Sequence, residues 1–418
     1  MSDPGLPAAT ATSPLAEPAS FLRELGLALH QSGAAAHELE QWLQQAGEQL
    51  GLQVEAYAVL TFLALSVRDP AGAQKTEMLR LPAYDYNMAR LIELQALCRE
   101  IRGTADLPHY RQRLATIVAA PPPWGGWRFA ALGFLLSASL AVLLRGGLGE
   151  ILCGGLIGVV FVSLHRLCAR VPRLAPAVPV LLCALAAILA QGLAHGLPLP
   201  SPLIAAVAGV ALLLPGFTLT VAMSELATQN YLAGTGRLVG ALILLFLMGA
   251  GLAIGSTLTV ALWPAAASLP VEVLPGWAIW PAVAVLGVSL LAVVQAPWSA
   301  LPVSVGGCLL AWATYSFFGA ALGEIFAAFA ASFCVAAAGH IYARLSGRPA
   351  VLVQIPGLIT LVPGSMGFRG LHALIGHDSL AGIGLLTDML LTGALLAVGL
   401  LLADNLLPLL GRQAQRPE

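Results

Sequence analysis

Most of this chain consists of long apolar segments separated by short polar connections. A helix that crosses a bilayer needs about 20 apolar residues, and ten segments from residue 127 onward approach that length. Their approximate bounds are 127–144, 148–166, 176–194, 202–226, 236–262, 278–294, 301–318, 320–342, 350–372 and 380–408. We therefore expect an all-α polytopic membrane protein with ten transmembrane helices.

Charged residues are concentrated ahead of these segments. The chain is 58% hydrophobic and 10% charged, whereas an ordinary soluble domain carries roughly 25% charge. Residues 1–120 nevertheless hold 9 of the 20 basic and 13 of the 21 acidic side chains. This distribution predicts a small polar domain followed by a membrane domain. Because the net charge is −1 and no basic tract occurs, nucleic acid is not an expected partner.

The polar part divides into a tail, a folded domain and a linker. Residues 1–19 are rich in Pro, Ala and Ser and lack the pattern of a signal peptide, which predicts a disordered tail. Residues 20–120 mix helical spacing with β-branched segments, which predicts a small cytoplasmic α+β domain. Within it, residues 54–67 are expected to form one strand and residues 77–81 a second. Residues 121–126, with three prolines and two glycines, predict a stiff linker.

Arginine residues predict the orientation of the ten spans. If the polar domain is cytoplasmic, the even-numbered connections face inward, and they contain most of the arginines. These are Arg166, Arg170, Arg173, Arg237, Arg344 and Arg348, while the tail at 411–418 adds Arg412 and Arg416. The outward connections contain only Arg145 and Arg369. This agrees with the positive-inside rule and predicts a multi-pass protein of the inner (plasma) membrane with both termini cytoplasmic.

A Pro-Gly break occurs at corresponding places in the two halves of the membrane domain. Pro363-Gly364 follows Pro215-Gly216 by 148 residues, and a Gly-x-Gly motif lies at the same distance beyond each. Five spans per half is an odd number, so residues 127–262 and 278–410 are predicted to be inverted repeats. Paired Pro/Gly interruptions of this kind point to a transporter's binding site. Each break lies about 20 Å into its span, so the two are expected to meet near mid-membrane.

At these breaks the chain resembles the threonine/serine exporter family. The resemblance rests on Leu214–Gly216 with Glu225, Gly236 and Arg237 downstream, on Ile355–Gly357 leading into Leu361–Ser365, and on residues 32–34, 37–40 and 87–91 of the polar domain. It extends from about residue 20 to 410, although the family usually has Asp where this chain has Glu225. The resemblance implies a cytoplasmic domain followed by ten membrane helices. It also implies export of small hydroxy amino acids coupled to the proton motive force.

The predicted substrate site is centred on the two breaks. The N-terminal end of a half-helix presents N–H groups to a carboxylate, and a C-terminal end presents carbonyls to an ammonium group. Nearby hydroxyl, amide and guanidinium groups complete the candidate set. The predicted substrate-binding residues are Pro215, Gly216, Thr218, Thr220, Asn230, Gln354, Pro363, Gly364, Ser365 and Arg369. For each Ser or Thr considered alone, a hydrogen bond from its hydroxyl to a carbonyl of its own helix is an equally good explanation of its presence.

Three ionisable residues are predicted to couple transport to protons, because charges inside membrane segments are costly and usually functional. Glu225 lies nine residues after the first Pro-Gly and can pair with Arg237 or take a proton. Asp388, early in the tenth span, is the acid that we expect to be buried. The alternatives are an interfacial carboxylate without a coupling role at Glu225 and a structural polar contact at Asp388.

Three functions remain open from the sequence. The first is a proton-coupled exporter of threonine, serine or similar solutes, the second a dicarboxylate exporter on the same scaffold, and the third a membrane-anchored enzyme or sensor acting through the polar domain. No nucleotide-binding or nucleophile motif occurs, and the six cysteines form no CxxC pair. We therefore expect no enzyme activity, cofactor or metal. The expected partners are a small amino acid, protons, the lipid bilayer and a second copy of the chain.

Overall fold

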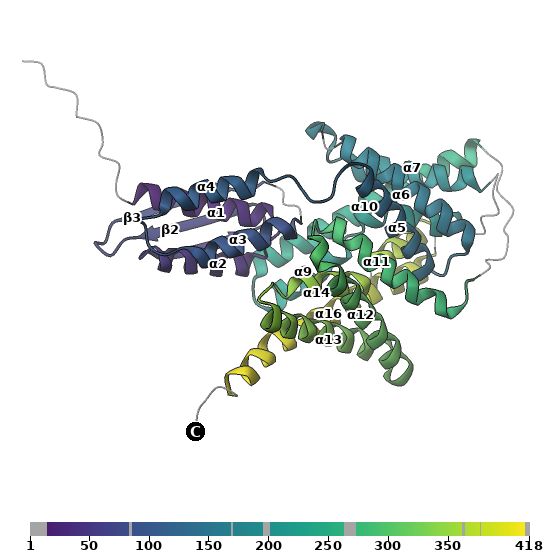
Figure 1. The fold of residues 1–418 in the computed structure, drawn as a ribbon. Coiled ribbons are helices and arrows are strands. Elements are labelled where there is room, and N and C mark those ends of the chain that lie inside the picture. Colours follow the sequence, from purple (N-terminus) through teal and green to yellow (C-terminus); the bar gives the residue numbers. More distant parts are fainter. Residues whose placement is uncertain are drawn as a thin grey trace, which may run out of the picture. The chain divides into compact units, whose positions relative to one another are not determined.

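The computed structural model describes residues 15–82, 86–168, 170–194, 201–262, 273–361, 364–376 and 378–413. By its internal contacts the chain divides into two compact units, Met1–Pro122 and Pro123–Glu418 (Figure 1). Each unit is described by itself.

The first unit combines helices with a small antiparallel sheet, which confirms the predicted α+β class. Its described helices are α1 (Ala16–Gln31), α2 (Ala36–Gln49), α3 (Met88–Glu100) and α4 (Leu107–Ala119). Its described strands are β1 (Gln53–Val59), β2 (Phe62–Arg68) and β3 (Gln74–Arg80), paired in the order β1-β2-β3. Helix α1 begins inside the segment 1–19 that the sequence predicts to be a tail.

The prediction of a single strand over residues 54–67 is wrong. Val59 pairs with Phe62, so the chain reverses at Leu60 and Thr61 and makes two strands. Two-residue hairpin turns usually contain Gly, Asn or Asp. Neither Leu60 nor Thr61 is of these types, so the sequence does not indicate the turn. The second predicted strand, 77–81, is part of the longer β3.

One face of the sheet is buried against the helices. Leu63, Leu65 and Val67 of β2 are at most 1% exposed. An added Cβ on Gly26 of α1 would lie 3.0 Å from Leu63 Cδ2, so α1 packs directly on this face. The alternating burial of β1 and β2 is the period-two pattern of a sheet with one covered face.

The second unit consists of helices. Those described are α5 (Gly126–Leu143), α6 (Leu148–Cys168), α7 (Val178–Leu193), α8 (Pro202–Gly209), α9 (Gly216–Ala227), α10 (Tyr231–Leu262), α11 (Ile279–Val293), α12 (Leu301–Leu322), α13 (Glu324–Ser346), α14 (Val351–Leu361), α15 (Gly364–Ile375) and α16 (Ser379–Gln413). Short 3₁₀ turns occupy Pro172–Leu174, Ala211–Leu213, Gly276–Ala278 and Trp298–Ala300.

By length and composition, the described residues contain eight helical segments that can cross a membrane, or nine if the bent pair around Val210 counts as one. Helix α7 is apolar but has only 16 residues. The prediction of a mostly helical, multi-span membrane domain is confirmed. Of the ten predicted spans, the described residues support eight or nine.

The two halves of this unit share one pattern of helix neighbours. Helix α6 packs against α5 and α8, while α10 packs against α7 and α9. In the same way α12 packs against α11 and α14, while α16 packs against α13 and α15. Helices α9 and α15 have 12 residues each, and their first residues are Gly216 and Gly364. Helices α10 and α16 begin at Tyr231 and Ser379, so both helix pairs keep the 148-residue offset of the Pro-Gly motifs.

Close contacts show which helices run in the same direction. An added Cβ on Gly251 of α10 would strike Val180 of α7, and one on Gly255 would strike Ala184. From the first contact to the second, the residue numbers increase in both helices, so α7 and α10 are parallel. Helices α13 and α16 are parallel by the same criterion, because Gly399 abuts Phe329 and His340 Nε2 lies 2.6 Å from Asp404 Oδ1.

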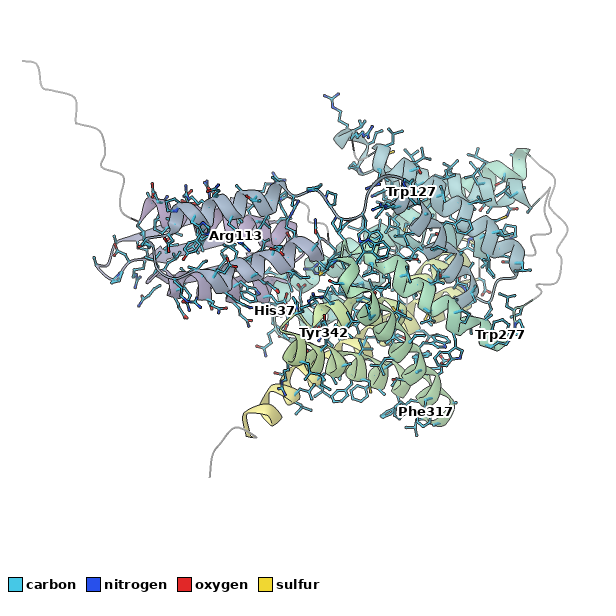
Figure 2. All side chains as sticks on the ribbon, in the orientation of Figure 1. His37, Arg113, Trp127, Trp277, Phe317 and Tyr342 are labelled. Carbon is cyan, nitrogen blue, oxygen red and sulfur yellow. The ribbon has the colours of Figure 1, made fainter. Side chains whose placement is uncertain are left out.

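Large aromatic side chains project from several helix ends. Trp127, Trp277 and Phe317 are 77%, 70% and 69% exposed, and Figure 2 shows Trp277 and Phe317 projecting away from their helices. Trp and Tyr are typical of the two edges of a membrane-spanning region, and the exposed Trp127 and Trp277 fit this pattern.

The start of the second unit is fixed by Trp124. This side chain is 1% exposed, and its Nε1–H donates to the Ala296 carbonyl at 2.7 Å. Its ring centroid lies 4.3 Å from that of Trp298. The segment 121–126, which the sequence predicts to be a linker, is therefore anchored at Trp124 to the connection between α11 and α12.

Candidate functional site

The first predicted break separates α8 from α9. Helix α8 ends at Gly209, a 3₁₀ turn follows, and α9 begins at Gly216 with Pro215 as its N-cap residue. The bend of 56° lies at Val210, between Pro202–Gly209 and Ala211–Ala227, and so it precedes the predicted Pro215-Gly216 break. Proline lacks an N–H and has a fixed φ, so it ends one helix and suits the start of the next.

The second break separates α14 from α15. Helix α14 ends at Leu361 and α15 begins at Gly364. Pro363, a predicted site residue, lies outside the described residues. Pro356 lies within α14, where its carbonyl accepts hydrogen bonds from Thr360 Oγ1 at 2.9 Å and Cys308 Sγ at 3.4 Å.

The two breaks meet at their glycines. A Cβ built on Gly364 would lie 3.1 Å from Gly216 N, 3.2 Å from Gly216 Cα and 3.3 Å from Leu214 Cβ. The backbones approach this closely because neither glycine carries a side chain. The structure thus brings together the two breaks that the repeat predicts to converge, while their depth in a membrane stays a prediction.

Two helix N-termini converge at this contact, because α9 and α15 both begin there. Each helix N-terminus carries about half a positive charge from its aligned peptide dipoles. Thr218 and Ser365, in the two first turns, are both half-buried. Thr220 is fully buried, and its Oγ1 donates to the Gly216 carbonyl at 3.4 Å. This arrangement is suited to an anionic group with a neighbouring hydroxyl.

Three other predicted binding residues lie away from the glycine contact. Gln354 is near the start of α14, and its Nε2 donates to the Ala336 carbonyl of α13 at 3.5 Å. Asn230 lies between α9 and α10, and its backbone N–H donates to the Glu225 carbonyl at 2.8 Å. Arg369 is exposed on α15.

Glu225 and Arg237 form a buried ion pair. Arg237 Nε donates to Glu225 Oε2 at 3.0 Å, and Arg237 Nη2 donates to Glu225 Oε1 at 2.9 Å. The two side chains are 4% and 7% exposed. The pair joins the last turns of α9 to the beginning of α10, and so it holds the half-helix that starts at Gly216. The pairing proposed from the sequence is present.

The prediction that Asp388 is buried is wrong. Asp388 is exposed on α16, whereas the adjacent Met389 is 1% exposed. Helix α16 is apolar on nearly every side, so hydropathy could not identify its covered face. Among the described residues, neither Asp388 nor Arg369 takes part in an ion pair.

One carboxylate outside the predicted site is completely buried by the structure. Glu150 is 0% exposed and accepts backbone N–H groups from Gly147 at 2.9 Å and Ser201 at 2.8 Å. It thereby ties the start of α6 to the residue preceding α8. The same four residues, Leu-Gly-Glu-Ile, recur around Glu324, which is exposed, so the motif alone did not indicate burial.

Comparisons with known proteins match nearly the whole chain. A family model described as "Putative threonine/serine exporter" matches residues 20–259, and one described as "Threonine/Serine exporter, ThrE" matches residues 278–406. A "Threonine/serine exporter" of Corynebacterium glutamicum is 26% identical over 350 residues, which are 80% of this chain and 69% of that protein.

Fungal proteins are also similar. "Pheromone-regulated membrane protein 10" of Candida albicans is 24% identical over 369 residues, 84% of this chain and 33% of that protein. Its namesake in Eremothecium gossypii is 21% identical over 367 residues, 84% of this chain and 48% of that protein. The chain thus spans a third to a half of these longer relatives. No solved structure matches the chain.

Proposed function

Because the chain belongs to the threonine/serine exporter family, we propose that it exports threonine, serine or a similar small hydroxy amino acid. It is a multi-pass membrane protein of a transporter family, which implies a non-enzymatic role. The proposed export is driven by the proton motive force.

The observation that carries this proposal is the contact between Gly216 and Gly364. It directs the N-termini of α9 and α15 at one point, where a substrate carboxylate would replace its lost hydration with backbone N–H groups. Thr218, Thr220 and Ser365 supply hydroxyls for the substrate's own hydroxyl or carboxylate. A neutral zwitterion also needs an acceptor for its ammonium group, and the carbonyls at the end of α14 fit that role.

We further propose ten spans arranged as two inverted repeats with cytoplasmic termini. The parallel directions of α7 with α10 and of α13 with α16 support this arrangement, since each pair is separated by one broken segment that must cross back. On this basis α7 is the third span in spite of its length, and α14 with α15 forms the ninth.

Glu225 is the proposed site of proton coupling. Protonation of its carboxylate would remove the charge that holds Arg237, and would release the far end of α9 from α10. Since α9 begins at the glycine contact, a proton at Glu225 would act on the helix that also binds the substrate.

Transport into proteoliposomes tests the function. Purified protein should catalyse counterflow of labelled threonine, and an imposed pH gradient should raise the initial rate. Serine should compete, and succinate should not. If neither amino acids nor dicarboxylates exchange, the transport proposal fails, and if succinate exchanges and threonine does not, the substrate class is wrong.

Matched variants test the site. Thr218→Val and Ser365→Ala should raise the KM for threonine, because each removes a hydroxyl beside the glycine contact. Ser163→Ala is the control, since this exposed hydroxyl of α6 donates to Val159 O of its own helix at 2.7 Å. Equal KM values in all three variants would remove these hydroxyls from the site.

A further inference from the structure

One flank of the α15–α16 hairpin exposes charge within an apolar surface. We call it the α15–α16 face and define it by Arg369, Leu380, Ala381, Gly384, Asp388 and Leu391, all of which are exposed. Ala381, Gly384 and Asp388 are spaced three and four residues apart, so they lie along one side of α16. Leu380 and Leu391, 89% and 44% exposed, flank them.

The two charged residues lie at the same level of the hairpin. An added Cβ on Gly367 of α15 would strike Met389 of α16, and one on Gly370 would lie 3.0 Å from Leu385 Cβ. The helices are therefore antiparallel, and Arg369 lies within about one helical turn of the level of Asp388. Successive residues of an α-helix are rotated by about 100° around its axis. Counted from these contacts, this rotation places Arg369 and Asp388 on the same flank of the hairpin.

Lipid is a poor occupant for this face. Asp388 is the tenth residue of the 35-residue helix α16, which places it about 15 Å from the helix start. Charged side chains at such positions usually face protein or water and pair with one another. Among the described residues, however, neither Asp388 nor Arg369 takes part in an ion pair.

A second copy of the chain complements this surface. A two-fold axis beside the hairpin brings the acid of each copy to the base of the other, which is the self-complementary arrangement of a closed dimer. The small residues also fit, because an added Cβ on Gly384 would meet no atom within 4 Å. Small residues in a membrane helix allow another helix to approach closely, and polar side chains then strengthen the contact.

We infer that two copies associate through the α15–α16 face, with Arg369 of each copy paired to Asp388 of the partner subunit. This pairing satisfies two exposed charges at once and covers the apolar residues beside them.

Charge reversal of the full-length protein tests the pairing. Asp388→Arg or Arg369→Asp alone should weaken dimerisation in nanodiscs by about tenfold or more, because like charges then face each other. The double variant should restore it. Glu324→Arg, which reverses an exposed carboxylate on α13, is the control and should leave the dimer intact. Mass is measured by light scattering, and association unchanged in both single variants would overturn the pairing.

Cross-linking tests the face without changing its charge. Gly384→Cys should form a disulfide between copies on mild oxidation, and Gly240→Cys should not. Gly240 is the matched control, since it is an exposed glycine of α10 whose added Cβ would also meet no atom within 4 Å. Equal cross-linking of the two variants, or a monomeric wild type, would refute the interface. Both assays are done without substrate, so their failure leaves the proposed export function standing.

Discussion

Removal of the Glu225 carboxylate should strongly destabilise the membrane unit. The pair is bidentate at 2.9 and 3.0 Å, and its side chains are 4% and 7% exposed. Glu225→Ala removes the carboxylate that pairs with the buried guanidinium of Arg237. Loss of one partner from such a pair costs about 3–5 kcal/mol, which corresponds to roughly a hundredfold to several thousandfold in the unfolding equilibrium.

The free energy of unfolding can be measured by titration with a denaturing detergent in mixed micelles. The matched control is Asp404→Ala in the His340–Asp404 pair, where the side chains are 27% and 40% exposed. An exposed pair contributes about 0–1 kcal/mol, so this variant should remain close to the wild type.

A double substitution separates the cost of an unpaired charge from the value of the pair. Glu225→Leu combined with Arg237→Leu removes both charges and should recover most of the lost stability, because apolar replacement of a buried pair is often neutral or stabilising. The reasoning is refuted if Glu225→Ala costs no more than Asp404→Ala, or if the double variant is as unstable as the single one.

Three further predictions concern other parts of the chain. Gly364→Val should abolish threonine counterflow, because its Cβ would lie 3.1 Å from the Gly216 backbone; Gly192→Val, with no atom within 4 Å, should transport normally, and equal rates would contradict the glycine contact. Glu150→Ala should lower thermal stability in detergent by about 1–3 kcal/mol for each of the two backbone N–H groups left unpaired, and an unchanged melting temperature would contradict this role. Burial raises the pKa of Glu40 above its ordinary value of 4.5. Protonation of Glu40 therefore stabilises the fold below pH 4.5, and this stabilisation is lost as the pH rises through the folded-state pKa. Glu40→Gln should therefore increase hydrogen-exchange protection of α2 and β1 at pH 7 but not at pH 4, and equal protection at pH 7 would argue against it.

The start of α9 could be predicted from sequence because proline and glycine act locally, whereas the end of α8 at Gly209 was not indicated. Pro215 cannot continue a helix, and α9 accordingly begins at Gly216. The contact between Gly216 and Gly364 agrees with the expectation that the two breaks, 148 residues apart in sequence, meet.

Burial within the membrane unit could not be predicted in the same way. In a soluble helix an apolar stripe marks the covered face, but α16 is apolar on almost all sides. Asp388 and Met389 are adjacent, and Met389 is the covered residue because it packs against Gly367 of α15 and within a larger buried cluster. Glu150 shows the opposite case, in which a charged residue is buried because two backbone N–H groups happen to lie beside it.

The short helix α7 has a consequence for the surrounding lipid. Its 16 residues rise about 24 Å, whereas its proposed counterpart α13 has 23 residues and rises about 34 Å. A hydrocarbon core about 30 Å thick is therefore thicker than α7 is long and thinner than α13 is long. Thinning of the bilayer relieves such a mismatch around the short α7, and helix tilt relieves it for the long α13. A change of acyl-chain length should thus act in opposite directions on α7 and on α13.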